Sequence, residues 1–251
     1  MLLCATALAG CSKIDINSIS EAPLGGARIK FANFGVNAPS VNFYDGTNKV
    51  TAVGPSSGLE SPTGTLYGRF AAAALYVDIT TGQHTLTGTV SPTATTDPGL
   101  TVSTASMNLE AGKFYTYYQS GIYNATAKTA DGFVVEDPLP ATFDWTKAYI
   151  RFINASGNSQ PMALFAKDQV TLAEVPIGAA VAYKSAGAFT AVNATTYDLA
   201  ARVAGSSTNA ISRTSQAFSA GRYYTITAYG DMTVTGTTAA NRPQLDNTAN
   251  R

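Results

Sequence analysis

The chain has 251 residues, of which 45% are hydrophobic, 10% are aromatic and only 13% are charged. Its 16 basic and 16 acidic residues balance, so it lacks the net positive charge typical of nucleic-acid binding, and we expect no nucleic-acid partner. The apolar content is enough to offset the entropy of ordering, which excludes a disordered chain. The many Thr, Ser, Gly and Tyr residues favour strands and turns.

The first eleven residues resemble the signal peptide of a bacterial lipoprotein. Residues 2–10 form a short run of apolar and small residues that ends in Leu8-Ala9-Gly10-Cys11, which resembles a lipobox. The resemblance implies cleavage before Cys11 and a lipid-anchored N-terminus at that residue. We expect 1–10 to be a signal peptide whose basic opening residues lie upstream of Met1. The run is too short to span a bilayer, so the alternative to a signal peptide is a buried strand or helix of the first domain.

The same resemblance predicts where the protein resides. An acylated Cys11 would anchor the chain to a membrane of the bacterial cell envelope, and Ser12, which is not Asp, points to the outer membrane. Both cysteines lie within the first eleven residues, so no disulfide is expected after Cys11. Residues 11–26 are polar, contain Pro and Gly, and read as a tether.

Two segments of the chain recur. The pattern Ala27, Ile29, Phe31, Asn33 returns at an offset of 121 as Ala148, Ile150, Phe152, Asn154, and the segment 111–116 returns at an offset of 109 as 220–225. Most matched positions are apolar or Gly, which are the types that specify a fold. We therefore predict two copies of one domain at 27–137 and 147–246, with a linker at 138–146 and a tail at 247–251. Because the second offset is smaller than the first, we expect shorter loops in the second copy.

Alternation of apolar and polar residues predicts strands throughout both copies. In the first strand, Arg28 and Lys30 share one face while Ile29 and Phe31 share the other. Turn residues separate further expected strands near 41–43, 75–79, 84–90, 100–108, 113–120 and 132–136. Gly68–Tyr76 reads as a short helical turn. About seven strands per copy predict an all-β protein of two tandem β-sandwiches.

One local motif bears on topology. Leu109-x-Ala-Gly112-x-x-Tyr115 is matched by Phe218-x-Ala-Gly221-x-x-Tyr224. Both resemble the corner of immunoglobulin-like sandwiches in which a Tyr hydroxyl bonds back to the preceding loop. The paired cysteines and the core Trp of antibody domains are missing, so we predict immunoglobulin-like β-sandwich domains by architecture only.

Together, the lipobox, the two Ala-x-Ile-(Lys/Arg)-Phe-x-Asn openings and the repeated Ala-Gly-x-(Phe/Tyr)-Tyr-Thr strand resemble the family called domain of unknown function 4397 (DUF4397). The resemblance covers about 27–137 and 147–246. It implies a β-sandwich protein of the cell envelope, and the family has no established activity or site residues to carry over.

Residues able to do chemistry are few. His84 is the only histidine and aligns with Tyr197, which indicates a half-buried ring at a strand end. A catalytic Cys–His or Ser–His–Asp set cannot be assembled, and we expect no cofactor and no metal. Asp137 and Asp246 match at the offset of 109, at strand exits. They read as turn caps, or as ligands for calcium or acids for hydrolysis.

Aromatic residues are the remaining candidates. Tyr115 and Tyr117 in the first copy, and Tyr224 in the second, lie on strands that carry aromatics on both faces. These rings either pack between strands or form an exposed platform for a sugar or a partner protein. The leading hypothesis is a non-enzymatic envelope lipoprotein that binds an envelope protein or polysaccharide, with Tyr115, Tyr117, Tyr224, Asp137 and Asp246 as candidate binding residues. The alternative is a carbohydrate-active or calcium-dependent envelope enzyme that uses carboxylates such as Glu136, Asp137 and Asp246.

Overall fold

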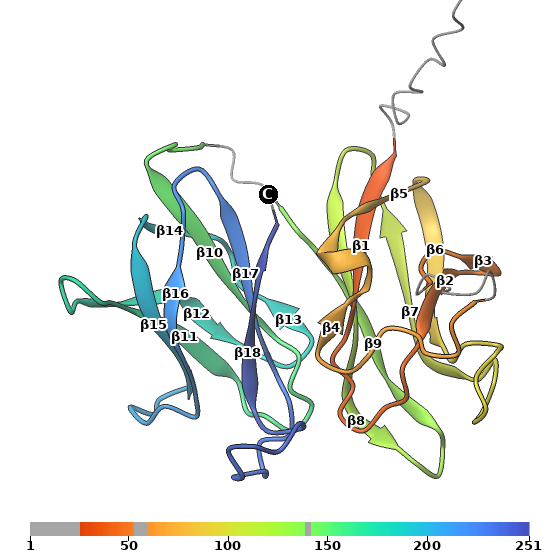
Figure 1. Cartoon of the computed structure of the whole chain (residues 1–251). Coiled ribbons are helices and arrows are strands. Elements are labelled where there is room, and N and C mark those ends of the chain that lie inside the picture. The colour runs from red at the N-terminus through yellow and green to blue at the C-terminus, as the bar shows by residue number, and fades with distance from the viewer. Residues whose placement is uncertain (1–25, 53–59, 139–141, 251) are drawn as a thin grey trace, which may run out of the picture.

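The computed structural model describes residues 26–52, 60–138 and 142–250, so the predicted lipidation site Cys11 lies outside the described residues. The described chain consists of strands, turns and one short 3-10 turn, which confirms the all-β prediction. The strands form two β-sandwiches that lie side by side (Figure 1), and each sandwich has one five-stranded and one four-stranded sheet.

The first sandwich is built around a parallel pair of strands. In its five-stranded sheet, β1 (Ala27–Asn33) pairs in parallel with β8 (Phe114–Asn124), β9 (Thr129–Glu136) follows β8, and β4 (Arg69–Phe70) and β5 (Val77–Ile79) pair with the other edge of β1. The four-stranded sheet has the order β3 (Asn48–Lys49), β2 (Asn42–Asp45), β6 (Gly82–Thr89), β7 (Thr101–Leu109).

The second sandwich repeats this plan. In its five-stranded sheet, β10 (Lys147–Asn154) pairs in parallel with β17 (Tyr223–Tyr229), β18 (Gln244–Ala249) follows, and β13 (Ser185–Ala186) and β14 (Thr190–Asn193) pair with the other edge of β10. The four-stranded sheet has the order β12 (Glu174–Val181), β11 (Met162–Asp168), β15 (Thr196–Val203), β16 (Ile211–Ala217). Each sheet of the second sandwich therefore has the same strand order as the corresponding sheet of the first.

Strand register shows that the sequence matches are structural equivalences. Ile29 lies opposite Tyr115 in the first sandwich, and Ile150 lies opposite Tyr224 in the second. Between these strands the second copy is shorter, as predicted. It is also more regular at one edge, because the longer β12 takes the place of the very short β3.

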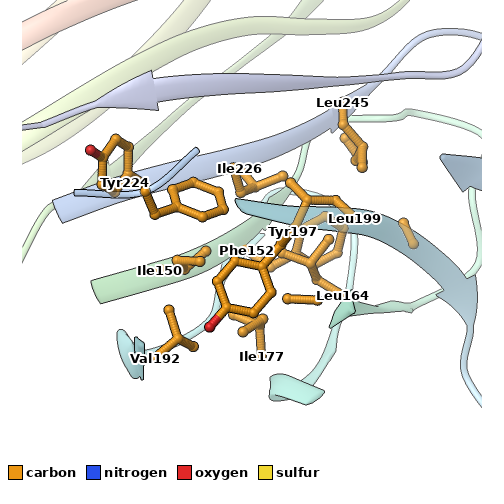
Figure 2. Close-up of a cluster of buried hydrophobic side chains, with 14 of the residues drawn as sticks. Ile150, Phe152, Leu164, Ile177, Val192, Tyr197, Leu199, Tyr224, Ile226 and Leu245 are labelled. Atoms are coloured by element: carbon orange, nitrogen blue, oxygen red, sulfur yellow. The ribbon is translucent and has the colours of Figure 1, made fainter. Parts of the chain in front are cut away.

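Each sandwich has its own hydrophobic core. In the first, Phe31 stacks on Phe43 with ring centroids 5.0 Å apart, and Tyr117 packs against both rings. Figure 2 shows the corresponding core of the second sandwich, where side chains from both sheets meet. The residues labelled there are Ile150, Phe152, Leu164, Ile177, Val192, Tyr197, Leu199, Tyr224, Ile226 and Leu245.

The predicted helical turn near Gly68–Tyr76 is a 3-10 turn at Ala71–Ala74 and is not right-handed throughout. Ala72 and Ala73 have φ values of 47° and 55°, in the left-handed region. That conformation costs an L-residue about 1–2 kcal/mol, because Cβ crowds the following carbonyl oxygen. Although alanine has a high helix propensity, the run 71–74 does not form a regular right-handed helix.

Candidate functional site

The candidate tyrosines lie inside the sandwiches. Tyr115, Tyr117 and Tyr224 are all buried, because their positions along the strands point them into the cores. They pack between strands and do not form an exposed platform. The Tyr115 hydroxyl accepts a hydrogen bond from the Glu110 N–H at 3.1 Å, and the Tyr224 hydroxyl accepts one from the Ser219 N–H at 3.0 Å. Both predicted corner motifs therefore form.

Tyrosines on the opposite strand face lie between the two sandwiches. Tyr229 of the second sandwich stacks on Phe34 of the first at a centroid distance of 4.4 Å, and the Tyr118 hydroxyl of the first lies 3.5 Å from the Thr227 hydroxyl of the second. The outer faces of the two five-stranded sheets thus cover each other. The buried residues of this interface cluster are Ala32, Phe34, Tyr118, Phe133, Val135, Ile153, Ala155 and Tyr229.

A buried ion pair also joins the sandwiches. The Arg151 guanidinium bonds to the Asp137 carboxylate, and the two residues are only 0% and 3% exposed. Arg151 also donates to the Glu136 carbonyl at 2.8 Å. Asp137 accepts further bonds from the hydroxyls of Tyr76 and Thr116, both at 2.6 Å. Every one of these partners is internal, so Asp137 holds the interface and has no free face for a substrate or a calcium ion.

A second cation, Lys30, is buried close to this pair. Its ammonium group donates to the Asn250 side-chain oxygen at 2.8 Å and lies 4.9 Å from the centre of the Tyr76 ring. Burial lowers the pKa of Lys30 to about 8, and the charge of Asp137 opposes that shift. The signal for this network was in the sequence, since Lys30 and Arg151 occupy the same place in the repeated opening motif.

The contacts of the two cations are reciprocal. Lys30 and Arg151 are equivalent positions on β1 and β10. Asp137 and Asn250 are also equivalent, because their N–H groups bond to the Phe114 and Tyr223 carbonyls in the same way. Lys30 of the first sandwich therefore bonds to the second sandwich as Arg151 of the second bonds to the first.

This register corrects the alignment of the two acids. Thr227 is the equivalent of Tyr118, and Asp246 lies opposite Thr227 where Phe133 lies opposite Tyr118. Asp246 is thus the counterpart of a phenylalanine and not of Asp137. The sequence match was wrong because the connection from β17 to β18 is longer than the one from β8 to β9. Asp246 is half-buried, and this burial raises the pKa of its carboxyl group, which accepts a bond from the Thr248 hydroxyl.

A second reciprocal pair lies further along the interface. Tyr67 and Tyr183 are equivalent. Tyr67 lies two residues before Arg69, which is opposite Asn33, and Tyr183 lies two residues before Ser185, which is opposite Asn154. The Tyr67 ring contacts Tyr229 at 5.7 Å, and the Tyr183 hydroxyl lies 2.9 Å from the Ser120 hydroxyl at the position equivalent to Tyr229. The interface therefore has approximate two-fold symmetry, as in an isologous dimer.

His84 has a structural partner. Its Nδ1 lies 2.8 Å from the Asp45 carboxylate, and the ring is buried at β6. Register confirms that its equivalent is Tyr197. Leu86 lies opposite Asp45 of β2, and Leu199 lies opposite Ala166, the equivalent position of β11. His84 and Tyr197 each precede these leucines by two residues. Within the described ranges, no three His, Cys, Asp or Glu side chains gather closely enough to hold a metal ion.

One hollow lies at the end of the second sandwich opposite the end at which Lys147 begins β10. Loop 230–243 forms one wall and the start of β16 forms the other, and the hollow between them, which is open to solvent, has a volume of about 480 Å³. Asp231 fixes the base of the loop by accepting bonds from the Thr233 hydroxyl, the Thr233 N–H and the Asn158 amide, which lower the pKa of its carboxyl group. The lining residues are Ala210, Ile211, Ser212, Met232, Val234, Thr235, Gly236, Thr237, Arg242 and Pro243.

Two smaller hollows are also present. One of about 350 Å³ lies beside Arg69 and the left-handed alanine turn. The other, about 230 Å³, lies between β14 and the end of β11, where Lys147 bonds to Asn193 at 2.7 Å. The loop at 230–243 is much longer than the corresponding connection at 125–128 in the first sandwich. The hollow beside this loop is therefore a feature of the second copy only.

The family of the chain follows from a match to the model named Domain of unknown function (DUF4397) over residues 27–165. The chain belongs to the DUF4397 family. The match covers the first sandwich and continues into β11 of the second, so it does not itself divide this DUF4397 protein into two family units. No curated protein matches the chain.

Three solved structures align with this DUF4397 protein at low similarity. A candidate cell adhesion protein of Bacteroides ovatus is 11% identical with a TM-score of 0.27, and the alignment covers 89% of this chain and 95% of that one. A candidate cell adhesion protein of Bacteroides fragilis is 12% identical with a TM-score of 0.23, over 89% and 96%. The Bacillus anthracis TIE protein is 12% identical with a TM-score of 0.22, over 81% and 33%. Similarities this low transfer no role to the present chain.

Proposed function

We propose that the chain is a non-enzymatic binding or structural module of the bacterial cell envelope, anchored by an acylated Cys11 and binding a partner at the end remote from the anchor. The observation that carries this proposal is the position of the hollow beside loop 230–243. β17 begins at the linker end of the molecule and ends at the loop, so the hollow faces away from the N-terminal side. Loops displayed on a rigid sandwich are common binding sites.

The chemistry of the hollow suits a small or extended ligand. Its volume lies within the usual range of ligand sites, roughly 300–1,000 Å³, and its lining combines Met232, Val234 and Pro243 with Thr hydroxyls and Arg242. Such a mixture of apolar surface and a few polar groups matches the envelope polysaccharides or proteins expected as partners. The rival enzyme hypothesis is weakened, because Asp137 is fully occupied within the interface and Glu136 pairs with Lys113 at 3.2 Å.

The test is a binding assay with a matched pair of substitutions. The chain is applied to an array of envelope polysaccharides and to isolated cell envelopes, as wild type, as Val234→Asp in the hollow and as Val175→Asp in the small hollow at the other end. We expect Val234→Asp to abolish binding and Val175→Asp to leave it unchanged. Equal binding by both variants, or release of sugars by the wild type, would refute the proposal. Mass spectrometry of the N-terminal peptide from the native host tests acylation separately.

A further inference from the structure

Three large apolar side chains are strongly exposed in the second sandwich or directly before its first strand. Trp145 is 76% exposed, Val170 is 80% exposed and Leu172 is 65% exposed. Trp145 is the only tryptophan of the chain. Single exposed apolar residues are ordinary, so their shared position is what requires explanation.

Strand register puts the three side chains at one end of the sandwich. Trp145 lies two residues before the start of β10, where Lys147 is opposite Asn193. The chain then turns from β14 into β15, and Tyr197 at the start of β15 is opposite Asp168 at the end of β11. The turn that carries Val170 and Leu172 follows Asp168 directly. It therefore projects from the same end as Trp145.

The first described strand, β1, begins at this same end (Figure 1). β1 and β10 run in the same direction, because contacts near their starts join Lys30 to Asn250, and contacts beyond their ends join Phe34 to Tyr229. In Figure 1 both strands begin at the upper end, where β18 also ends. Only the short segment 12–25 separates Cys11 from Gly26. An anchor at Cys11 would hold this end next to the bilayer.

The Trp145 ring and the turn that carries Val170 and Leu172 are both held in place by neighbouring residues. The Trp145 ring lies so close to Gly221 that a Cβ atom on that glycine would be 3.2 Å from Cε3 of the ring. The ring also makes an edge contact with Phe143, with ring centroids 4.4 Å apart. The Asp168 carboxylate accepts bonds from the Val170 N–H at 2.7 Å and the Thr171 N–H at 3.0 Å, which shapes the turn. Leu172 is held there at a φ of 62°, an uncommon conformation for a branched residue.

We propose that Trp145, Val170 and Leu172 rest in the headgroup region of the bilayer to which the chain is anchored. The inference rests on the proposed acylation of Cys11, since the tether is what brings this end to the membrane. Tryptophan prefers the membrane interface, where its ring is half in apolar surroundings and its N–H remains hydrated. Charges of both signs lie nearby, including Lys147 and Asp144, so the attraction is apolar and does not depend on anionic lipid.

The experiment uses the sole tryptophan as the probe. The acylated full chain is placed in vesicles of phosphatidylethanolamine and phosphatidylglycerol, with or without bromine on the lipid close to the headgroup. We expect a blue-shifted Trp145 emission that loses most of its intensity in the brominated vesicles. Leu172→Asn, which tolerates the positive φ, should restore much of that intensity. Ile122→Ser, at an exposed position on the opposite end of the molecule, should leave the quenching unchanged.

The outcomes separate this inference from the proposed function. An acylated chain whose Trp145 emission is not quenched overturns the membrane contact and leaves the anchor intact. If the native chain proves not to be acylated, the unmodified chain is added to the same vesicles. Quenching of Trp145 there supports the membrane contact, and unquenched Trp145 emission overturns it. Trp145 that is unquenched in vesicles but shielded from acrylamide in native envelopes would assign this end to a partner protein and would also overturn the proposal.

Discussion

Replacing Asp137 with alanine is expected to destabilise the whole protein far more than loss of a surface ion pair would. The substitution removes the partner of a fully buried Arg151 and leaves the hydroxyls of Tyr76 and Thr116 without their acceptor. It also leaves the buried Lys30 without the anion that favours its charged form. Breaking a buried ion pair by removing one partner costs roughly 3–5 kcal/mol.

The assay is equilibrium unfolding in urea, followed by tyrosine fluorescence and circular dichroism. Asp78→Ala is the matched control, because Asp78 pairs with Arg28 at 3.0 Å where both side chains are about half exposed. An exposed pair of this kind contributes roughly 0–1 kcal/mol. The double variant Asp137→Leu with Arg151→Met removes both charges together and should recover much of the loss, since an apolar pair of similar volume often replaces a buried ion pair without cost.

Two results would show that the reasoning about the interface is wrong. One is a cost for Asp137→Ala no larger than that for Asp78→Ala, which would mean that water reaches Arg151. The other is a double variant as unstable as the single one, which would mean that packing and not uncompensated charge determines the cost.

Three further outcomes are expected. Tyr115→Phe and Tyr224→Phe should each lower the free energy of unfolding by roughly 0.5–1.5 kcal/mol through loss of one hydrogen bond, while Tyr123→Phe should have no measurable effect in the same urea titration. Because Lys30 has a folded-state pKa of about 8 and an unfolded value of about 10.4, the folded state binds fewer protons between these values. Stability should therefore rise with pH across that window by up to about 3 kcal/mol relative to Lys30→Met, and a parallel pH profile for the two proteins would contradict this. His84→Tyr removes the hydrogen bond between the ring and the partly exposed Asp45 carboxylate and should cost roughly 0.5–1.5 kcal/mol in a thermal melt, and loss of cooperative melting would count against the equivalence of the two copies.

Much of the fold could be predicted from short-range patterns. The alternation around Ile29 and the shared Ala-Gly turn before Tyr115 and Tyr224 specify strand faces and corners, and both depend only on neighbours in sequence. The offset of 121 predicted that Ile29 and Ile150 are equivalent, and the parallel registers of both copies agree with it.

The part that failed depends on contacts between distant residues. A period of two assigns Tyr118 and Lys30 to the outer face of their sheet but cannot say whether water or a second sheet covers that face. The alignment of Asp137 with Asp246 assumed a constant offset through a loop whose length differs between the copies. The hollow beside loop 230–243 could not be predicted, because its walls come from segments that the fold alone brings together.

The approximate two-fold symmetry of the interface suggests how such a chain can change over time. Two identical single-sandwich chains joined by this surface would have to keep Lys30 and its partner complementary on both sides at once, and their association would weaken on dilution. Joining the halves by a short linker makes the contact intramolecular, with an effective concentration in the millimolar range. Each half is then free to differ, as in the exchange of Lys30 for Arg151 and of Asp137 for Asn250. The lengthened loop at 230–243 fits the same freedom, since one half can acquire a new surface while the other continues to hold the joint.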